Sequence, residues 1–246
     1  MKLVSLSPSI TEILTTLGAL DRLVGATDAC ELTGNHVTRL GPPKALQISK
    51  FACLKPDRIL ADARENRPEE IEKLEKHWPV KIFDVRRLQD VGDCVADLGR
   101  LVGKSEEAKQ WNAALRKEIA SNEEAFRDRP RKRAVLLIWN QPYLTVNFDT
   151  YPSRLVEASG GTNVFRKEPI LEFPVEMEEM IEENPEVLLL AGGPAPFQKR
   201  DIAKFRQYRI FSKIPIHLVK LPLLDRYGPQ TIEALKTLRQ IFESIP

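Results

Sequence analysis

Short apolar runs, each bounded by turn residues, alternate along this chain with segments whose apolar side chains recur every three or four residues. The runs have the length of buried strands, and they lie at 3–6, 23–26, 58–61, 80–83, 134–139, 187–190 and 216–219. The periodic segments predict helices from about residue 10 and at 48–54, 68–76 and 231–244. This alternation is typical of an α/β fold with mostly parallel sheets covered by helices.

Between 91 and 126 the pattern is almost entirely helical, and Gly103 is expected to divide it into two helices. The second would be roughly 22 residues and about 33 Å long, at 1.5 Å per residue, which predicts a rigid strut. We therefore expect two Rossmann-like lobes joined by one long interdomain helix. The N-terminal lobe would occupy 1–102, the helix 103–128 and the C-terminal lobe 129–246.

The two halves of the chain also repeat one another. Leu-Lys-Pro-Asp at 54–57 and Glu-Asn-Pro-Glu at 183–186 each lead into an apolar run. At both 13–25 and 155–165, an apolar helix closed by glycine leads into a short segment that contains apolar residues. The repeat is much longer than a solenoid period and so predicts a duplicated lobe, with coincidence among common connections as the alternative.

One helix start carries a local signal. Ser9 and Glu12 have the S-x-x-E spacing of a capping box, in which both side chains bind free amide groups. This spacing predicts a helix that begins at about Ile10 and ends at Gly18.

Charge and cysteine content exclude some classes of protein. The 246 residues carry 37 Lys and Arg against 35 Asp and Glu, a formal net charge of +2, which gives no broad cationic field. We therefore expect no nucleic acid partner. The cysteines at 30, 53 and 94 have no metal-type spacing, and Cys53 and Cys94 are expected to be buried in helices without disulfides.

The start of the chain leaves its location open. The chain begins Met-Lys and enters an apolar strand, without the apolar region and cleavage site of a secretory leader. We expect a periplasmic or cell-surface protein if a leader has been removed, and a cytoplasmic protein otherwise. No run approaches the roughly 20 apolar residues of a membrane span.

Catalytic signatures are absent from the sequence. It contains no phosphate-binding glycine loop, no G-x-S-x-G and no H-E-x-x-H. His217 alternates within a strand and is expected to be structural, whereas His36, near Cys30, is a weak candidate metal ligand. We therefore expect a protein that is not an enzyme and that has neither a catalytic residue nor a bound metal of its own.

The candidate ligand-binding residues follow the carboxyl ends of the predicted strands, where open α/β sheets bind ligands. They are Ser7, Pro8, Cys30, Asp62, Arg64, Trp139, Tyr143, Phe197, Asp225, Arg226 and Tyr227. Aromatic faces and proline-rich loops suit a large, flat, partly apolar ligand, and the charged residues would orient its polar rim. The alternative is that Trp139 and Phe197 close the ends of the two cores.

Several segments resemble one family in order and spacing. They are Val-Ser-Leu-Ser-Pro-Ser-Ile-Thr-Glu at 4–12, Leu-Lys-Pro-Asp at 54–57, Gly-Gly-Thr-Asn-Val-Phe at 160–165 and Asn-Pro-Glu-Val at 184–187. Over essentially its whole length the chain resembles the cobalamin- and siderophore-type (class III) periplasmic substrate-binding proteins of ABC importers. Four more segments resemble the cobalamin-binding, helical-backbone branch: Glu-Asn-Arg at 65–67, Trp-Asn-Gln-Pro-Tyr at 139–143, Asn-Phe-Asp-Thr-Tyr at 147–151 and Pro-Ala-Pro-Phe at 194–197.

The resemblance implies a function. It implies two α/β lobes, a long helix between them, a ligand in the cleft, and delivery to the permease of an ABC importer. The implied ligand is cobalamin or another corrinoid, carried as cargo by a monomer without an intrinsic cofactor. Acidic residues would meet arginines of the permease, with Glu178 on the C-lobe and Glu69 or Glu70 on the N-lobe. The alternative for these acids is that they complement helix dipoles.

Departures from the family pattern keep other functions open. Ser49 stands where the family often has Glu, Asp62 stands where some cobalamin binders have tryptophan, and Gly-Pro-Pro-Lys at 41–44 replaces a glycine-rich turn. The ligand could therefore be a siderophore or haem. The rivals from other classes are a cytoplasmic two-lobed enzyme acting on a nucleotide or phosphorylated substrate, and a cytoplasmic sensor or chaperone of the same fold.

Overall fold

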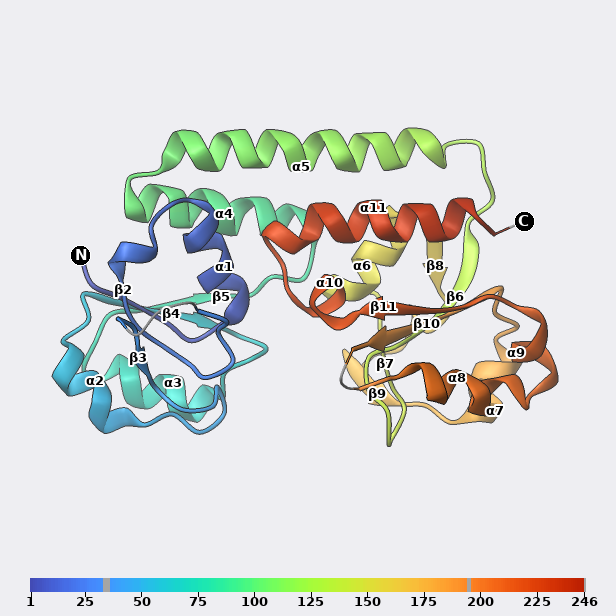
Figure 1. The fold of residues 1–246 in the computed structure, drawn as a ribbon, viewed down its shortest axis with the longest axis horizontal. Helices are drawn as coiled ribbons and strands as arrows, with labels where there is room; N and C mark the ends of the chain where they lie inside the picture. The colour runs from blue at the N-terminus through green and yellow to red at the C-terminus, as the bar shows by residue number, and fades with distance from the viewer. Residues whose placement is uncertain (33–35, 194–195, 246) are drawn as a thin grey trace. The chain divides into compact units, whose positions relative to one another are not determined.

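The computed structural model describes residues 1–32, 36–193 and 196–245, in two compact units (Figure 1). Unit 1 consists of Met1–Val85 and Gln89–Ala113, and unit 2 of Arg86–Leu88 and Ala114–Pro246. The fold is α/β with mostly parallel sheets, as predicted. The three-part division into two lobes and a separate helix stays a prediction.

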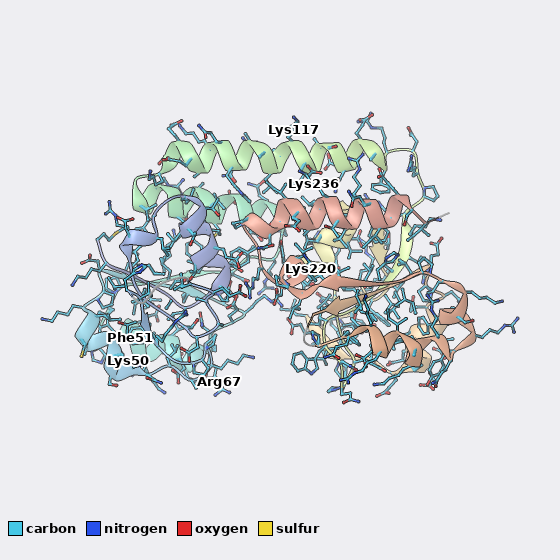
Figure 2. All side chains as sticks on the ribbon, in the orientation of Figure 1. Lys50, Phe51, Arg67, Lys117, Lys220 and Lys236 are labelled. Atoms are coloured by element: carbon cyan, nitrogen blue, oxygen red, sulfur yellow. The ribbon has the colours of Figure 1, made fainter. Side chains whose placement is uncertain are left out.

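Unit 1 contains a fully parallel five-stranded sheet in the order β3-β2-β1-β4-β5. Its strands are β1 Leu3–Ser5, β2 Leu23–Ala26, β3 Thr38–Arg39, β4 Arg58–Asp62 and β5 Val80–Phe83. Its helices are α1 Pro8–Thr16, the 3-10 turn η1 Leu20–Arg22, α2 Ile48–Leu54, α3 Pro68–Glu75 and α4 Leu88–Val102. Phe51 of α2 and Leu74 of α3 are fully buried against Val4 and Ile59 of the sheet. Figure 2 labels Phe51 beside Lys50 on α2.

Unit 2 contains a parallel four-stranded sheet in the order β11-β10-β6-β8. These strands are β6 Lys132–Leu137, β8 Gly161–Asn163, β10 Val187–Gly192 and β11 Ile216–Lys220, and β7 Leu144–Val146 pairs antiparallel with β9 Glu172–Pro174. The helices are α6 Tyr151–Ala158, α7 Met177–Glu182, α8 Lys199–Arg206, α9 Arg209–Lys213, α10 Leu221–Asp225 and α11 Pro229–Glu243. Figure 1 shows α6 and α11 on one side of this sheet and α7, α8 and α9 on the other. Met180, Phe205 and Phe211 of the second group are fully buried against β6 and β10.

The long helix α5 spans Ser105–Ala125, close to its predicted length, and the boundary between the two units falls within it. Its C-terminal part packs on α11 of unit 2. The Nζ of Lys236 (labelled in Figure 2) lies 3.8 Å from Glu118, and buried Asn122 donates a hydrogen bond to the carbonyl of Leu235.

The two sheets repeat one topology, which explains the echo in the sequence. The order β2-β1-β4-β5 in unit 1 matches β8-β6-β10-β11 in unit 2, and the helices α1 and α6 follow the matching strands β1 and β6. In each unit the chain starts at the centre of a sheet and adds strands on both sides. The similar sequences at 54–57 and 183–186 precede the matching strands β4 and β10.

Two local predictions were wrong. Helix α1 begins at Pro8, because proline is well placed at the first position of a helix, and its N-cap is Ser7. Ser9 is therefore buried inside the helix and does not start a capping box. Cys53 is exposed on α2, because the buried face of this short helix is occupied by Phe51, whereas Cys30 and Cys94 are buried. No helix in the described parts of the chain is long and apolar enough to span a membrane.

Candidate ligand-binding site

All strands of the two main sheets are parallel within their sheet, so their carboxyl ends meet at one edge of each unit. Ligands of open α/β sheets bind at such an edge. The predicted residues follow β1, β2 and β4 in unit 1, and they follow β6, β10 and β11 in unit 2.

In unit 1, the loops after β1 and β4 are joined through side chains. The hydroxyl of Ser7 donates a hydrogen bond of 2.9 Å to Oε1 of Glu65. Asp62, the last residue of β4, accepts hydrogen bonds from the backbone amides of Arg64 and Glu65 at 2.9 and 3.1 Å. Ser7, Pro8 and Asp62 are buried, and Arg64 is exposed. Unit 1 thus brings four of the predicted ligand-binding residues together. Among these four, only Arg64 has an exposed side chain.

Cys30 is connected to the same edge through hydrogen bonds of its thiol. Its thiol lies 3.2 Å from the hydroxyl of Thr11 and 3.3 Å from that of Thr27, and Thr11 also donates to the carbonyl of Ser7. The side chain is 1% exposed, and burial raises the pKa of the thiol. A neutral, buried thiol is neither a nucleophile nor a metal ligand at neutral pH, so Cys30 supports the loops.

Two residues of this edge were not predicted as site residues. Glu65 holds Ser7, and buried Asn66 accepts a hydrogen bond from the amide of Asp62 at 2.8 Å and donates to the carbonyl of Leu6 at 3.2 Å. Both lie in the Glu-Asn-Arg segment that resembles the family. An acid and an amide directly after a buried strand were the available signal.

In unit 2, Trp139 is the exposed aromatic residue of the edge. It follows β6 by two residues, forms an isolated β-bridge with Leu144, and is 48% exposed. Trp139 therefore does not close the end of the core, and a large apolar ring at the carboxyl end of a central strand can stack on a flat ligand. The side chain of Asn140 donates to the carbonyl of Pro196 at 3.4 Å, which connects this loop to the segment after β10. Pro194 and Ala195 of the predicted Pro-Ala-Pro-Phe segment lie outside the described residues.

Phe197 belongs to the hydrophobic core. It is 0% exposed, and its ring is stacked on Tyr143 at 6.2 Å with 14° between the planes. The alternative given above, that this ring closes the core, is therefore the one that the structure favours. Tyr143 is half-buried over the core, and burial raises the pKa of its phenol. Its phenol stays neutral at physiological pH.

The last group surrounds the start of α11. Asp225 is exposed, Arg226 is half-buried, and Tyr227 is 4% exposed and packs edge-on against Tyr151 at 6.3 Å. The hydroxyl of Tyr151 is 2.9 Å from that of Thr231 and donates to the carbonyl of Arg226 at 3.3 Å. This network fixes the Asp-Arg-Tyr turn and leaves Asp225 as its exposed side chain.

The predicted docking acids differ in their surroundings. Glu69 of α3 and Glu178 of α7 are exposed, and within the described residues no hydrogen bond or ion pair engages their carboxylates. Glu70 is half-buried and held within unit 1, because Oε2 accepts from the amide of Leu46 at 3.3 Å and Oε1 lies 3.7 Å from Lys73. Of the two N-lobe candidates, Glu69 is therefore the one whose carboxylate is exposed and has no internal partner in the described residues.

No group of three or more His, Cys, Asp or Glu side chains that could hold a metal ion occurs in the described residues. Cys30 is buried, and His36 is exposed on the surface. The geometry thus suits binding by aromatic and charged loop residues.

Sequence comparison identifies relatives along nearly the whole chain. The family model described as periplasmic binding protein matches residues 3–216. The vitamin B12-binding protein of Photorhabdus laumondii is 25% identical over 245 residues, which cover 98% of this chain and 87% of that protein. The vitamin B12-binding protein of Vibrio parahaemolyticus is 21% identical over 253 residues, with coverage of 99% and 90%.

Solved structures of similar fold include binders of two kinds of chelate. The periplasmic vitamin B12 binding protein BtuF of Vibrio cholerae has a TM-score of 0.84 and 20% identity, covering 98% of this chain and 96% of that one. A periplasmic heme binding protein from Pseudomonas aeruginosa has a TM-score of 0.82 and 18% identity, covering 100% and 94%. At these identities the likeness shows the fold.

Proposed function

Because this chain belongs to the periplasmic binding protein family, we propose that it captures a large metal chelate, foremost a corrinoid such as cobalamin, and delivers it to the permease of an ABC importer. The two relatives named above are vitamin B12-binding proteins. For this chain we accordingly propose no catalytic step and no intrinsic cofactor. It would work as a monomer in the periplasm or at the cell surface, with one ligand per chain and without nucleic acid.

The observation that carries the proposal is the exposed indole of Trp139 at the carboxyl end of β6. Tryptophan is highly buried on average, because its large apolar surface gains free energy on burial. A corrin or porphyrin ring offers a flat, partly apolar face that would cover it. Asp225 and Arg226, which follow β11 at the carboxyl edge of the same sheet, would then meet the polar rim of the chelate. Arg64 stays a candidate for this role at the edge of unit 1.

Equilibrium dialysis of the protein against cyanocobalamin, a ferric siderophore and haemin, each followed by its own absorbance, tests the proposal. We expect cyanocobalamin to be retained at one molecule per chain. Retention of none of the three, together with turnover of a nucleotide or a phosphate ester, would contradict the proposal and favour the enzyme.

Haem is the second candidate, and the heme binding protein with a TM-score of 0.82 supports it. Haem iron takes an axial ligand from a protein side chain, whereas cobalamin carries an axial nitrogen ligand of its own. If haemin binds, its absorbance spectrum will show whether a protein side chain is an axial ligand of the iron.

For delivery, we propose that Glu69 and Glu178 contact cationic residues of the permease. Their carboxylates are exposed and have no partner among the described residues, which supports this role. Glu70 is disfavoured, because its carboxylate is bound to the amide of Leu46 and lies near Lys73. Changing Glu69 and Glu178 together to alanine should leave chelate affinity unchanged and remove stimulation of the importer ATPase in proteoliposomes. The matched control is Glu72→Ala, an exposed acid of the same helix α3. Loss of chelate binding in the double variant, or equal loss of stimulation in the control, would contradict the docking role.

A further inference from the structure

A hollow of about 280 Å³ lies in unit 2 between the loop after β6 and the start of α8. Its polar lining consists of Asn140, Gln141, Gln198, Arg200, Asp201 and Lys204. We propose that this hollow binds an anionic oxygen group, a carboxylate or a phosphate ester, carried on the chelate. The inference rests on the proposed function and narrows its ligand class.

The size of the hollow sets what it can hold. Pockets that enclose a whole small-molecule ligand have volumes of roughly 300 to 1,000 Å³. A corrinoid or a haem exceeds 280 Å³, so the hollow accommodates a side group and not the ring. Trp139 immediately precedes Asn140 of the lining and is 48% exposed. A ring stacked on Trp139 can therefore extend a polar arm into the hollow.

The one acid in the lining is already occupied. The side chain of Asp201 is 7% exposed, accepts a hydrogen bond from the amide of Gln198 at 2.8 Å, and lies 3.1 Å from Nζ of Lys204. The hydrogen bond from Gln198, followed by the interaction with Lys204 and then by the charge of Arg200, lowers the pKa of Asp201. The carboxylate is therefore ionised at neutral pH and balances the charge of Lys204.

The hollow then keeps one unbalanced positive charge, because the single carboxylate of Asp201 faces both Lys204 and Arg200. The side chain of Arg200 is exposed, and no acceptor or acid in the described residues binds its guanidinium. Asp201 is also the only acid between residues 187 and 224, a segment that contains seven Lys and Arg residues. The overall charge of +2 conceals this local excess. A planar guanidinium binds carboxylate or phosphate through two parallel hydrogen bonds, which makes it selective for this chemistry.

A larger hollow in unit 2, of about 460 Å³, provides a contrast. Arg133 in its wall is paired with Glu183 at 2.7 Å, and Arg166 lies 3.6 Å from Glu157 and over the ring of Phe148. Its arginines are thus balanced within the protein. An unbalanced positive charge in a polar hollow distinguishes the smaller site.

The test compares matched chelates with and without the anionic group. Cyanocobalamin carries a phosphodiester that dicyanocobinamide lacks, and haemin carries carboxylates that its dimethyl ester lacks. Calorimetry is done with wild type, Arg200→Gln and the control Arg209→Gln, which removes an exposed arginine of α9 outside the hollow. We expect Arg200→Gln to weaken the anionic member of the bound pair about tenfold or more and to leave the other member and the control unchanged. Equal weakening of both members, or none, overturns the inference.

Inorganic phosphate separates this inference from the proposed function. If wild type binds none of the chelates, the proposed function fails, and a phosphate titration followed through the indole NMR signal of Trp139 tests the hollow itself. If phosphate saturates wild type and Arg209→Gln but does not bind Arg200→Gln, the hollow is an anion site that takes free phosphate. No response in wild type overturns it.

Discussion

Lys55 and Asn184 occupy the same position in the two units, since each follows a helix, precedes a proline and has a positive φ, 47° and 45° respectively. In both units the amide two residues later donates a hydrogen bond to a backbone carbonyl: that of Lys2, directly before β1, at 2.9 Å, and that of Arg133, near the start of β6, at 2.8 Å. The similar sequences at these positions therefore encode one repeated connection between a helix and a strand. Left-handed backbone costs about 1–2 kcal/mol for most residues, and asparagine tolerates it better than most.

Asn184 should therefore not tolerate alanine. We expect Asn184→Ala to lower the free energy of unfolding by about 1–2 kcal/mol, because alanine is strained at φ 45° and loses the side-chain hydrogen bond to the carbonyl of Glu182. Asn184→Gly, which relieves the backbone strain, should remain within about 0.5 kcal/mol of wild type. Urea unfolding measures both, and equal losses in the two variants would show that the conformation is not the cause.

Gly18 and Gly160, which close the repeated helices α1 and α6, should respond differently to alanine. Both have positive φ, but a Cβ at Gly18 meets no atom within 4 Å, whereas at Gly160 it would lie 2.5 Å from the ring of Phe126. We expect a loss of about 1–2 kcal/mol for Gly18→Ala from the backbone alone. Gly160→Ala should cost about 1–3 kcal/mol more, because the ring must move. Thermal unfolding compares them, and a smaller loss at Gly160 would contradict the packing described here.

The charge of Asp201 should make part of the stability depend on pH. Hydrogen bonding to the amide of Gln198 lowers its pKa in the folded state. A carboxyl whose pKa is lower in the folded state stabilises the fold at a pH above its unfolded-state pKa, which is near 4. This stabilisation is lost as the pH falls through the folded-state pKa. Asp201→Ala should therefore be less stable than wild type by about 1 kcal/mol at pH 7, the usual net contribution of one hydrogen bond. This difference should shrink below about pH 4, whereas Asp128→Ala, at an exposed position, should show little difference at any pH.

The framework of the fold could be predicted from the sequence, because buried parallel strands read as apolar runs. The predicted strand at 80–83 coincides with β5, and β4 and β10 differ from the predicted runs by one or two residues at one end. β3, β7, β8 and β9 were missed, since they have only two or three residues and contain polar side chains. Their pairing depends on neighbours far along the chain, which no local pattern contains.

The loops of the candidate site could be located from the sequence, but the exposure of their side chains could not. Phe197 is fully buried and Trp139 is half-exposed, although both aromatics follow a central strand. Phe197 is buried because it packs against Tyr143 and the hydrophobic core of unit 2. These contacts form only in the folded unit. Glu65 was missed for the same reason, because its partner Ser7 lies 58 residues earlier.

Capture of a corrinoid is tested most directly by calorimetric titration of cyanocobalamin into wild type, Trp139→Ala and Tyr208→Ala. Tyr208 is the matched control, since it is 37% exposed and lies between α8 and α9, outside the predicted loops. We predict saturation at one cyanocobalamin per wild-type chain, affinity weakened about tenfold in Trp139→Ala through loss of the stacking face, and no change in Tyr208→Ala. Absence of saturable binding in wild type, or unchanged affinity in Trp139→Ala, would contradict the account.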